Sequence, residues 1–482
     1  MRIVLIRPSE TKRVWVGIPR FFNDGIFLFP PLGIMQLKSY AESRGHEALI
    51  YDCLVKRADY EEAARYVKNS GAAVAGISAF THSLADVAGC AKAIKGLGDD
   101  IHVVVGGPHT YNFPDESIHL VESGLADSVI LGDGEEALAG LLDALEEGRE
   151  PEGVNGIIYK RCDGQIKRQG GVIYREELDS LPFPSRDIPA IESYYTPASH
   201  GGKMTTMITS RGCPYNCKFC NVQRRYRARS CSNIVDEIEA CQRMGFTEIF
   251  FIDDTFNITK ERVKEISEEI IGRGVRIKWG CKARCDQIDE ETLRAAKAAG
   301  CIRIHYGVET GAAAGLESID KRTTLQTIER AFSESRKTGI RTVAYFIIGC
   351  PHEKEVSQIF ETIRFAGKLA ADYAVFSLLS PYPDTEFYRE AVRDDIIDPR
   401  PWQDFIKDPC RQSALPTSWE EHFAKDELIG FLKRAHRSFY YRPLTVLRSL
   451  SDIHSVKELK RLFMGGISLV KLEFLKTGEG KI

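Results

Sequence analysis

The sequence has no strong excess of charge of either sign, since its 482 residues carry a formal net charge of −3. Nucleic-acid binding needs clustered positive charge, so this balance gives no case for a nucleic-acid partner. No apolar run approaches the roughly 20 residues that a membrane-spanning helix requires. Met1 leads directly into the strand-like run Ile3–Ile6, where a secretory signal would place a longer apolar segment. We therefore expect a cytoplasmic protein.

Two further patterns are missing. The Gly-x-Gly-x-x-Gly motif does not follow the first apolar run, which disfavours a dinucleotide site. The thirteen cysteines do not form the dense framework of a small secreted domain, because they are scattered through a long chain with much helical periodicity. Cysteines that form no disulfide framework favour a protein of a reducing compartment.

Three of these cysteines stand close together on one predicted loop. Cys213, Cys217 and Cys220 are separated by three residues and then two, directly after the strand-like run Met204–Ile208. Soft thiolate ligands that converge on a loop are typical of an iron–sulfur cluster. A cubane cluster held by three thiolates would keep one iron open for a substrate or cofactor. Structural zinc is the alternative, but zinc prefers four protein ligands and no Cys or His pair follows at the usual spacing.

Residues 1–147 alternate short apolar runs with helix-like periodicity five times. This alternation predicts an α/β domain with a parallel, doubly wound, Rossmann-like sheet. Ligands of such sheets bind beyond the carboxyl ends of the strands, which are rich in small residues here. Each glycine taken singly is explained as well by a tight turn. The predicted strands are Ile3–Ile6, Ala48–Tyr51, Ala73–Ile77, Val103–Val105 and Ser128–Leu131, and helices are expected at about 32–44, 59–69, 83–96, 115–123 and 135–147.

From Met204 onward the alternation returns six times, which predicts an open, partial (β/α)6 barrel with its chemistry at the carboxyl ends of the strands. The cysteine loop follows the first of these strands. The predicted strands are Met204–Ile208, Glu248–Ile252, Val275–Trp279, Ile302–Val308, Thr342–Ile348 and Tyr373–Leu379, with helices between them and after the last.

The fourth of these strands carries polar residues on one face. Strand alternation places Arg303, His305 and Glu309 toward the barrel interior, while Ile302, Ile304 and Val308 face the helices. Interior charges need partners, which a charged cofactor would provide. An internal ion pair between Arg303 and Glu309 is the alternative, and His305 is expected to be a hydrogen-bonded interior histidine rather than a proton relay.

Two segments flank the barrel. A hairpin is predicted from Gly156–Tyr159 and Gly171–Tyr174, followed by a proline-rich linker. Helical periodicity returns at 419–440 and 455–476. Leu428–Ile482 holds 11 Lys plus Arg and 4 Asp plus Glu, and the helix-like Leu459–Leu475 is basic and apolar enough either to lie on an anionic membrane or to cover the barrel. The predicted division of the chain is 1–147, a connector at 148–200, the barrel at 201–395 and a helical C-terminal region at 396–482.

The cysteine spacing, with Phe219 before the last Cys, resembles the signature of the radical S-adenosylmethionine (SAM) superfamily. The resemblance implies that Cys213, Cys217 and Cys220 hold a [4Fe-4S] cluster and that SAM binds at the open iron. It extends to the later strand ends, where it implies that Glu309 contacts the SAM ribose and Arg284 its carboxylate, while Gly349 leaves room for the adenine.

The first 147 residues resemble the cobalamin-binding domain fused to many radical SAM enzymes. The resemblance rests on Pro30-Pro31-Leu32-Gly33, Arg44-Gly45-His46-Glu47 and the segments 105–109 and 131–135. It lacks Asp-x-His-x-x-Gly, so no histidine is expected to ligate cobalt, and a domain of this kind can also persist without cobalamin. The residues that the resemblance implies for cobalamin are Ser78, Thr81, Gly106, Gly107, Pro108, Gly132, Gly134 and Glu135.

The resemblance implies C-methylation of a small natural-product or lipid substrate, with an external electron donor of the flavodoxin or ferredoxin type. One rival is cyclisation, ring contraction, dehydration or oxidation on the same scaffold. A second is a non-enzymatic iron–sulfur binding or sensor protein. Four other cysteines lie near barrel strands, where an auxiliary cluster or a hydrogen-atom donor is a further alternative; they are Cys281, Cys285, Cys301 and Cys350.

Overall fold

A computed structural model gives the structure of the chain. It describes residues 1–14, 28–98, 100–189, 191–194, 202–411, 415–442 and 466–467. The chain forms two compact units. The first contains Met1–Trp15, Pro30–Ser193 and Asp398–Leu415, and the second contains Val16–Phe29, Tyr194–Ile397 and Pro416–Ile482.

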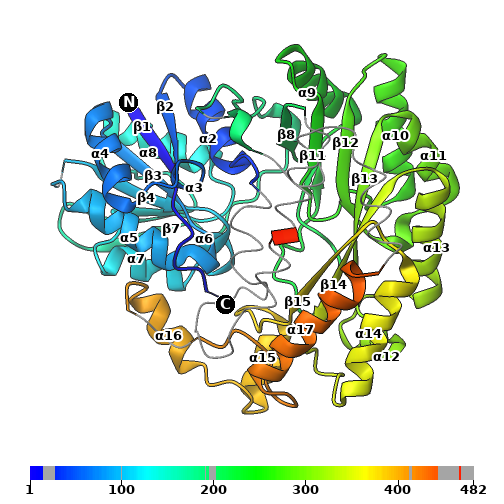
Figure 1. The fold of residues 1–482 in the computed structure, drawn as a ribbon. Helices are drawn as coiled ribbons and strands as arrows, with labels where there is room; N and C mark the ends of the chain where they lie inside the picture. The colour runs from blue at the N-terminus through cyan, green and yellow to red at the C-terminus, as the bar shows by residue number, and fades with distance from the viewer. Residues whose placement is uncertain are drawn as a thin grey trace. The chain divides into compact units, whose positions relative to one another are not determined.

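The first unit is built on a seven-stranded sheet of order β2-β1-β3-β4-β5-β6-β7 (Figure 1). Its first five strands are parallel and confirm the predicted doubly wound topology, because the order 2-1-3-4-5 is one of the two common orders of that fold. These strands are β1 (Arg2–Arg7), β2 (Glu47–Asp52), β3 (Val74–Ser78), β4 (His102–Gly106) and β5 (Ser128–Ile130).

The helices of this unit pack in two pairs, as expected for the two faces of a doubly wound sheet. Helix α2 (Leu32–Ser43) contacts α8 (Glu135–Glu146), and α4 (Tyr60–Ser70) contacts α5 (Leu84–Lys95). The helix predicted at 115–123 forms as one 3₁₀ turn, η2 (Glu116–Ile118), followed directly by α7 (His119–Glu122). A further short helix, α6 (Pro108–Asn112), precedes it and was not predicted. The unit also contains α16 (Arg400–Lys407), whose Trp402 ring lies 5.0 Å from that of Phe113.

The predicted hairpin forms, but with a different second arm. Strand β6 (Ile157–Lys160) pairs antiparallel with β5 and with β7 (Ile166–Gln169). The segment around Ile173, which we expected to be the second arm, makes a parallel bridge with Gly132. The arm predicted from apolar residues is therefore wrong, because the second arm is the polar strand β7, of which no residue is buried, while the backbone of Ile173 bonds Leu131 and Asp133 after β5.

The second unit contains six parallel strands in the order β15-β14-β13-β12-β11-β8, which confirms the predicted open, partial barrel (Figure 1). Each strand neighbours the one that precedes it in the chain, with a helix between, as in a (β/α) barrel. The strands are β8 (Met204–Met207), β11 (Glu248–Phe251), β12 (Lys278–Ala283), β13 (Cys301–Glu309), β14 (Arg341–Ile348) and β15 (Tyr373–Leu378).

Helices cover the outer surface of this sheet (Figure 1). On β13 the alternation is as predicted, because the outward-facing Tyr306 packs on Phe332 of α13 and its hydroxyl bonds Ser335 at 2.9 Å. These helices are α9 (Cys231–Arg243), α10 (Lys260–Gly272), α11 (Glu290–Ala298), α13 (Leu325–Lys337) and α14 (Val356–Leu369). Two further helices, α12 (Ala313–Ser318) and α15 (Glu386–Arg393), follow β13 and β15.

The C-terminal region contributes α17 (Lys425–Tyr440), within the predicted helical stretch 419–440. It packs on β15, where the rings of His436 and Phe439 contact Phe376. The helix predicted at 455–476, and with it the basic segment Leu459–Leu475, lies outside the described residues apart from 466–467. None of the described helices is long and apolar enough to cross a membrane.

Gly132 is fixed by both backbone conformation and packing. Its φ is +96°, and a β-carbon there would lie 2.3 Å from the carbonyl oxygen of Ile173. We expect Gly132→Ala to lower the free energy of unfolding by about 2–4 kcal/mol, from backbone strain plus overpacking. Urea unfolding would measure it.

The matched control is Gly164→Ala. Gly164 has a similar φ of +86° but no atom within 4 Å of an added β-carbon, so only backbone strain of roughly 1–2 kcal/mol applies. Equal losses in the two variants would contradict the packing role of the Gly132–Ile173 contact.

Candidate functional site

The cysteine loop is closed at its base by a short hairpin. Strand β9 (Ser210–Arg211) pairs antiparallel with β10 (Arg227–Ala228). The backbone N–H of Cys213 donates to the carbonyl of Gln223 at 2.8 Å. Gly212 has a φ of +82°, and a β-carbon there would lie 2.3 Å from the carbonyl oxygen of Arg225. The loop therefore leaves and re-enters the barrel at one fixed point.

A buried carboxylate holds this point to the next strand of the barrel. Asp253, 1% exposed, follows β11. It accepts hydrogen bonds from the backbone N–H and hydroxyl of Thr209, at 3.0 and 2.7 Å to one oxygen, and from the Ser210 hydroxyl at 2.6 Å. A buried carboxylate is stable only when such donors compensate its lost hydration, so the loop base is fixed to β11.

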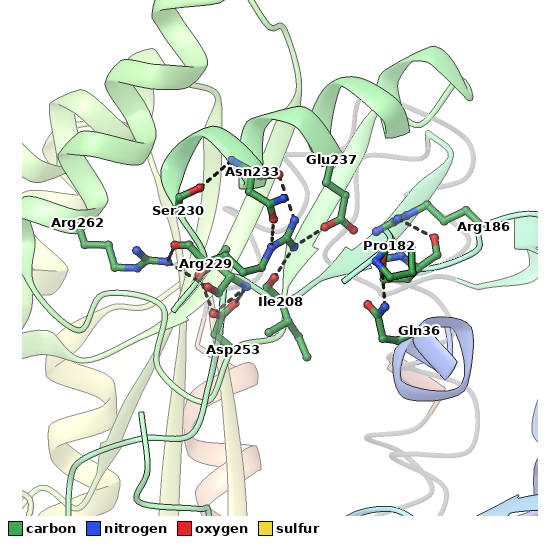
Figure 2. Close-up of polar contacts among 12 residues, drawn as sticks. Gln36, Pro182, Arg186, Ile208, Arg229, Ser230, Asn233, Glu237, Asp253 and Arg262 are labelled. Carbon is green, nitrogen blue, oxygen red and sulfur yellow. Dashed lines mark hydrogen bonds and ion pairs between the residues drawn. The ribbon is translucent and has the colours of Figure 1, made fainter. Parts of the chain in front are cut away.

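Two arginines complete this base, as Figure 2 shows. Arg229 donates to the carbonyl of Ile208 at 2.9 Å and pairs with the fully buried Glu237 of α9. Arg262 donates to the carbonyls of Thr209 and Arg229 at 3.0 and 3.1 Å. The planar guanidinium of Arg229 uses all three of its nitrogens, since it also bonds the side chain and carbonyl of Asn233.

The middle of the cysteine loop, at Lys218, is hydrogen-bonded to the segments that follow α12 and β15. The Lys218 N–H donates to the carbonyl of Ile319 at 3.1 Å, and its carbonyl accepts from the N–H of Phe387. The Lys218 ammonium pairs with Glu390 of α15 at 2.8 Å. The neighbouring Phe219 packs against the buried cluster that contains Cys350 and Phe387.

The three thiols lie close enough to influence one another. Burial raises the pKa of Cys217, with Cys213 adding to the rise and the nearby Lys321 and Arg284 opposing it. Burial likewise raises the pKa of Cys220. Within the described parts of the chain, no three His, Cys, Asp or Glu side chains converge on one point as a single metal ion would need. In an iron–sulfur cluster each thiolate binds a different iron atom, so the three sulfurs need not meet at one point. The three cysteines therefore fit an iron–sulfur cluster.

Glu309 and Lys321 form a buried ion pair beside these thiols. Lys321 Nζ lies 2.6 Å from Glu309 Oε1, and both residues are less than 9% exposed. Burial is the largest single influence on Lys321 and lowers its pKa, but the nearby Glu309 and Cys217 together leave the pKa raised. Glu309 has a φ of +69° at a bulge in β13, an uncommon conformation that aims its side chain. The sequence analysis missed Lys321, which lies outside any predicted strand end.

Arg284, at the end of β12, is also buried and fully engaged. It pairs with Asp286 at 2.9 Å, donates to the carbonyl of Lys321 at 2.6 Å and stacks on Tyr215 at 3.7 Å from the ring centroid. Arg284, Lys321 and Glu309 thus meet next to Cys217, so two of the residues predicted for SAM are brought together.

Gly349 lies at the end of β14 with a φ of +81°. Glu353 accepts hydrogen bonds from the N–H groups of Gly349 and Cys350 at 2.6 and 3.0 Å, and burial raises the Glu353 pKa to about 7. A β-carbon at Gly349 would lie 2.9 Å from Leu428 of α17. The glycine is needed for this close approach.

Below Glu309, the interior of the barrel holds a string of hydrogen-bonded side chains. Arg303 pairs with Glu248 at 3.2 Å, and its Nε donates to Nε2 of His305 at 3.0 Å. Nδ1 of His305 lies 2.9 Å from the hydroxyl of Tyr345. The alternative of an Arg303–Glu309 ion pair is wrong. Arg303 pairs with Glu248 and Glu309 pairs with Lys321 instead.

Among the other cysteines near the barrel strands, Cys281, Cys285, Cys301 and Cys350 are all buried. Burial raises the pKa of each thiol. No three of these cysteines gather as ligands of one metal ion among the described residues. A cluster is a different case from a single metal ion, so an auxiliary cluster at these cysteines stays a prediction.

In the first unit, the residues predicted for cobalamin lie on three loops at the carboxyl ends of the strands. The loops after β3 and β4 are joined, since Thr81 Oγ1 lies 3.1 Å from His109 Nδ1 and Ala79 donates to the carbonyl of Gly106. Gly107 has a φ of +124° and packs against the backbone of Ala79.

The remaining predicted residues border the same ends. Ser78 ends β3 and Pro108 begins α6. Gly132 packs against the backbone of Ile173, Gly134 faces Leu37, and Glu135 is buried at the start of α8. For Gly107 and Gly132, chain packing alone accounts for the glycine.

Comparisons with known proteins agree with this architecture. The model of the radical SAM superfamily matches residues 207–366, and the model of the B12 binding domain matches residues 27–142. An uncharacterised methyltransferase of Pyrococcus horikoshii is 31% identical over 462 residues, covering 94% of this chain and 95% of that protein.

Two other similar proteins were found. The anaerobic magnesium-protoporphyrin IX monomethyl ester cyclase of Rubrivivax gelatinosus is 28% identical, over 77% of this chain and 68% of that protein. The radical SAM methyltransferase TsrM of Kitasatospora setae, solved with cobalamin and a [4Fe-4S] cluster, has a TM-score of 0.66 at 20% identity, covering 82% of this chain and 78% of that one. At this identity the structural likeness confirms the fold.

The proton of His305 can be assigned from its partners. An arginine only donates, so Nε2 accepts from Arg303 and Nδ1 carries the hydrogen that is donated to Tyr345. Burial, with the nearby Arg303 adding to it, lowers the His305 pKa well below its usual value. We therefore expect a neutral Nδ1–H imidazole from pH 5.5 to 8, which ¹⁵N NMR of labelled histidines would detect.

Tyr345→Phe should move the Nδ1 resonance and leave Nε2 nearly unchanged. Tyr306→Phe, which removes a hydroxyl on the opposite face of β13, should move neither and serves as the control. Because the folded protein keeps His305 neutral while the unfolded chain protonates it, this residue removes stability as the pH falls below about 6.5. Titration of His305 near pH 6.5 in the folded protein would contradict the assignment.

Proposed function

We propose, on the premise that the chain belongs to the cobalamin-dependent radical SAM enzymes, that it methylates an unactivated carbon of a small-molecule substrate. The observation that carries the proposal is the three-cysteine loop at the carboxyl end of the first barrel strand, in a chain that also has a B12-binding domain. The non-enzymatic alternative is set aside, since the family is one of enzymes.

Cys213, Cys217 and Cys220 would hold the cluster. The tied loop base supports this role, because the cysteines are positioned before any cluster binds. When bound, the reduced cluster supplies one electron that cleaves SAM to methionine and a hydrogen-abstracting 5′-deoxyadenosyl radical, and methylcobalamin supplies the methyl group that replaces the abstracted hydrogen.

Glu309, Arg284 and Gly349 are proposed to bind SAM, and we add Lys321 to them. Glu309 is suited to accept hydrogen bonds from the ribose, since its position on a bulge beside Cys217 is fixed by Lys321. Arg284 and Lys321 are the buried cations beside Cys217 and are suited to the SAM carboxylate.

The loops of the first unit that contain Ser78, Thr81, Gly106, Gly107 and Pro108, and those with Gly132, Gly134 and Glu135, are proposed to contact cobalamin. Backbone N–H groups at strand ends and the tight glycine turns support this. The imidazole of His109 is fully buried and bonded to Thr81, so it is not placed as a cobalt ligand.

Further parts of the proposal concern partners and location. A flavodoxin- or ferredoxin-type protein would supply electrons, and a natural product or lipid would be the substrate. The basic C-terminal region would give peripheral membrane contact to a cytoplasmic protein. The counted excess of Lys and Arg over Asp and Glu after Leu428 supports the membrane part.

Anaerobic reconstitution tests the reaction. Protein loaded with iron, sulfide and methylcobalamin, and given SAM and reductant, should show both cluster and corrinoid absorption bands and should form 5′-deoxyadenosine. With a candidate acceptor it should form methylated product and S-adenosylhomocysteine. Cys217→Ala should lose the cluster band and SAM cleavage but keep the corrinoid band. A protein that cleaves SAM but never methylates any acceptor would contradict methyl transfer.

A second candidate is radical ring closure, favoured by the 28% identity to the magnesium-protoporphyrin ester cyclase. The same assay separates the two. A cyclised product with 5′-deoxyadenosine and without S-adenosylhomocysteine would favour ring closure.

The SAM-binding role of Glu309 has its own test. Glu309→Gln keeps the shape of the side chain but removes the charge, so we expect SAM affinity to fall roughly 10- to 100-fold, as for loss of a charged hydrogen bond. Equilibrium dialysis with cluster-loaded protein would measure this. Glu317→Gln, the same change at an exposed position on α12, is the control. Unchanged SAM affinity in the folded Glu309→Gln protein would remove Glu309 from the site.

A further inference from the structure

Arg224 lies just beyond the last cysteine and reaches back over the loop. One terminal nitrogen donates to the carbonyl of Tyr215, and the other donates to the carbonyls of Cys220, at 2.7 Å, and Cys217, at 3.4 Å. The two nitrogens of the planar guanidinium thus connect the beginning, middle and end of the segment that holds the cysteines. A lysine ammonium on a longer, flexible stem would not hold these acceptors in a fixed plane.

The charge of Arg224 is not balanced by an ion pair among the residues that the structure describes. Its three hydrogen-bond acceptors are neutral carbonyls. Its influence on the nearby Asp254 is minor, because burial dominates and raises that pKa while Lys282 and Arg224 oppose the rise. Three other cations near the thiols are paired, Lys321 with Glu309, Arg284 with Asp286 and Lys218 with Glu390.

The positive charge lies beside two of the cluster cysteines, because the guanidinium bonds the carbonyls of Cys217 and Cys220. A positive charge held there stabilises any negative charge that is added at the same place. One-electron reduction of an iron–sulfur cluster adds one such charge, and the net charge around a cluster is among the factors that set its potential.

We propose that Arg224 is a positioning residue for the cluster, which closes the cysteine loop through three carbonyls and makes the bound cluster easier to reduce. The inference rests on the proposed function, since it requires Cys213, Cys217 and Cys220 to hold the cluster. Two substitutions distinguish the hydrogen bonds of Arg224 from its positive charge. Arg224→Lys keeps the charge without the planar fork, and Arg224→Gln loses both.

The experiment uses the full chain, reconstituted anaerobically without substrate. Iron and sulfide content, the electron paramagnetic resonance of the reduced cluster and a redox titration are measured. For Arg224→Gln we expect a more negative midpoint potential, with a roughly 10-fold lower ratio of reduced to oxidised cluster at a fixed potential. This is the order expected for one charge at an effective dielectric constant near 20.

Arg224→Lys should stay near the native potential but bind less iron and give a broader resonance. Arg294→Gln is the matched control, because Arg294 is exposed on α11 and pairs with Glu290 of the same helix; it should change neither iron content nor potential. A native potential and native iron content in Arg224→Gln would overturn the inference while leaving the proposed function intact. Failure of the native protein to take up a cluster would instead overturn the proposed function, and this inference with it.

Discussion

The geometry of the cysteine loop depends on one buried carboxylate. Asp253 is withdrawn from water and accepts hydrogen bonds from Thr209 and Ser210, so moving the loop base would leave a buried carboxyl group without these partners. The same condition applies to Glu237, which is fully buried against Arg229. Displacing the base of the cysteine loop would therefore cost more free energy than moving an ordinary surface loop.

The rule that buried charges need partners also organises the barrel interior. From the amino end of β13 upward, Arg303 is paired with Glu248, His305 with Tyr345 and Glu309 with Lys321. Each pair spans different elements, so the pairs hold strands and loops in register, and the first and last of them also balance charge. Only the top pair lies beside a cysteine of the loop. A bound ligand there would meet groups that are already oriented, which lowers the cost of binding.

Much of this arrangement was predictable from the sequence, because strand periodicity and the cysteine spacing are local signals. Both sheets and the inward face of β13 follow from them. The partners across the barrel do not, since Glu248 precedes Arg303 by 55 residues and nothing local marks the pair. Lys321 was missed for the same reason. The second hairpin arm was placed wrongly because apolar content was taken as the sign of a strand, whereas Ile173 forms an isolated bridge to Gly132.

The way in which the two units share the chain bears on how the protein is made. Phe29, which comes before nearly all of the first unit, stacks on Phe250 of the barrel at 5.4 Å, while Trp402, which comes after the barrel strands, packs on Phe113 of the first unit. A domain that emerges first from the ribosome usually folds first. Here the first unit lacks α16, and the barrel lacks α17, until nearly the whole chain has been synthesised. Both units therefore complete their packing late, and the nascent chain exposes apolar surface of each for most of its synthesis.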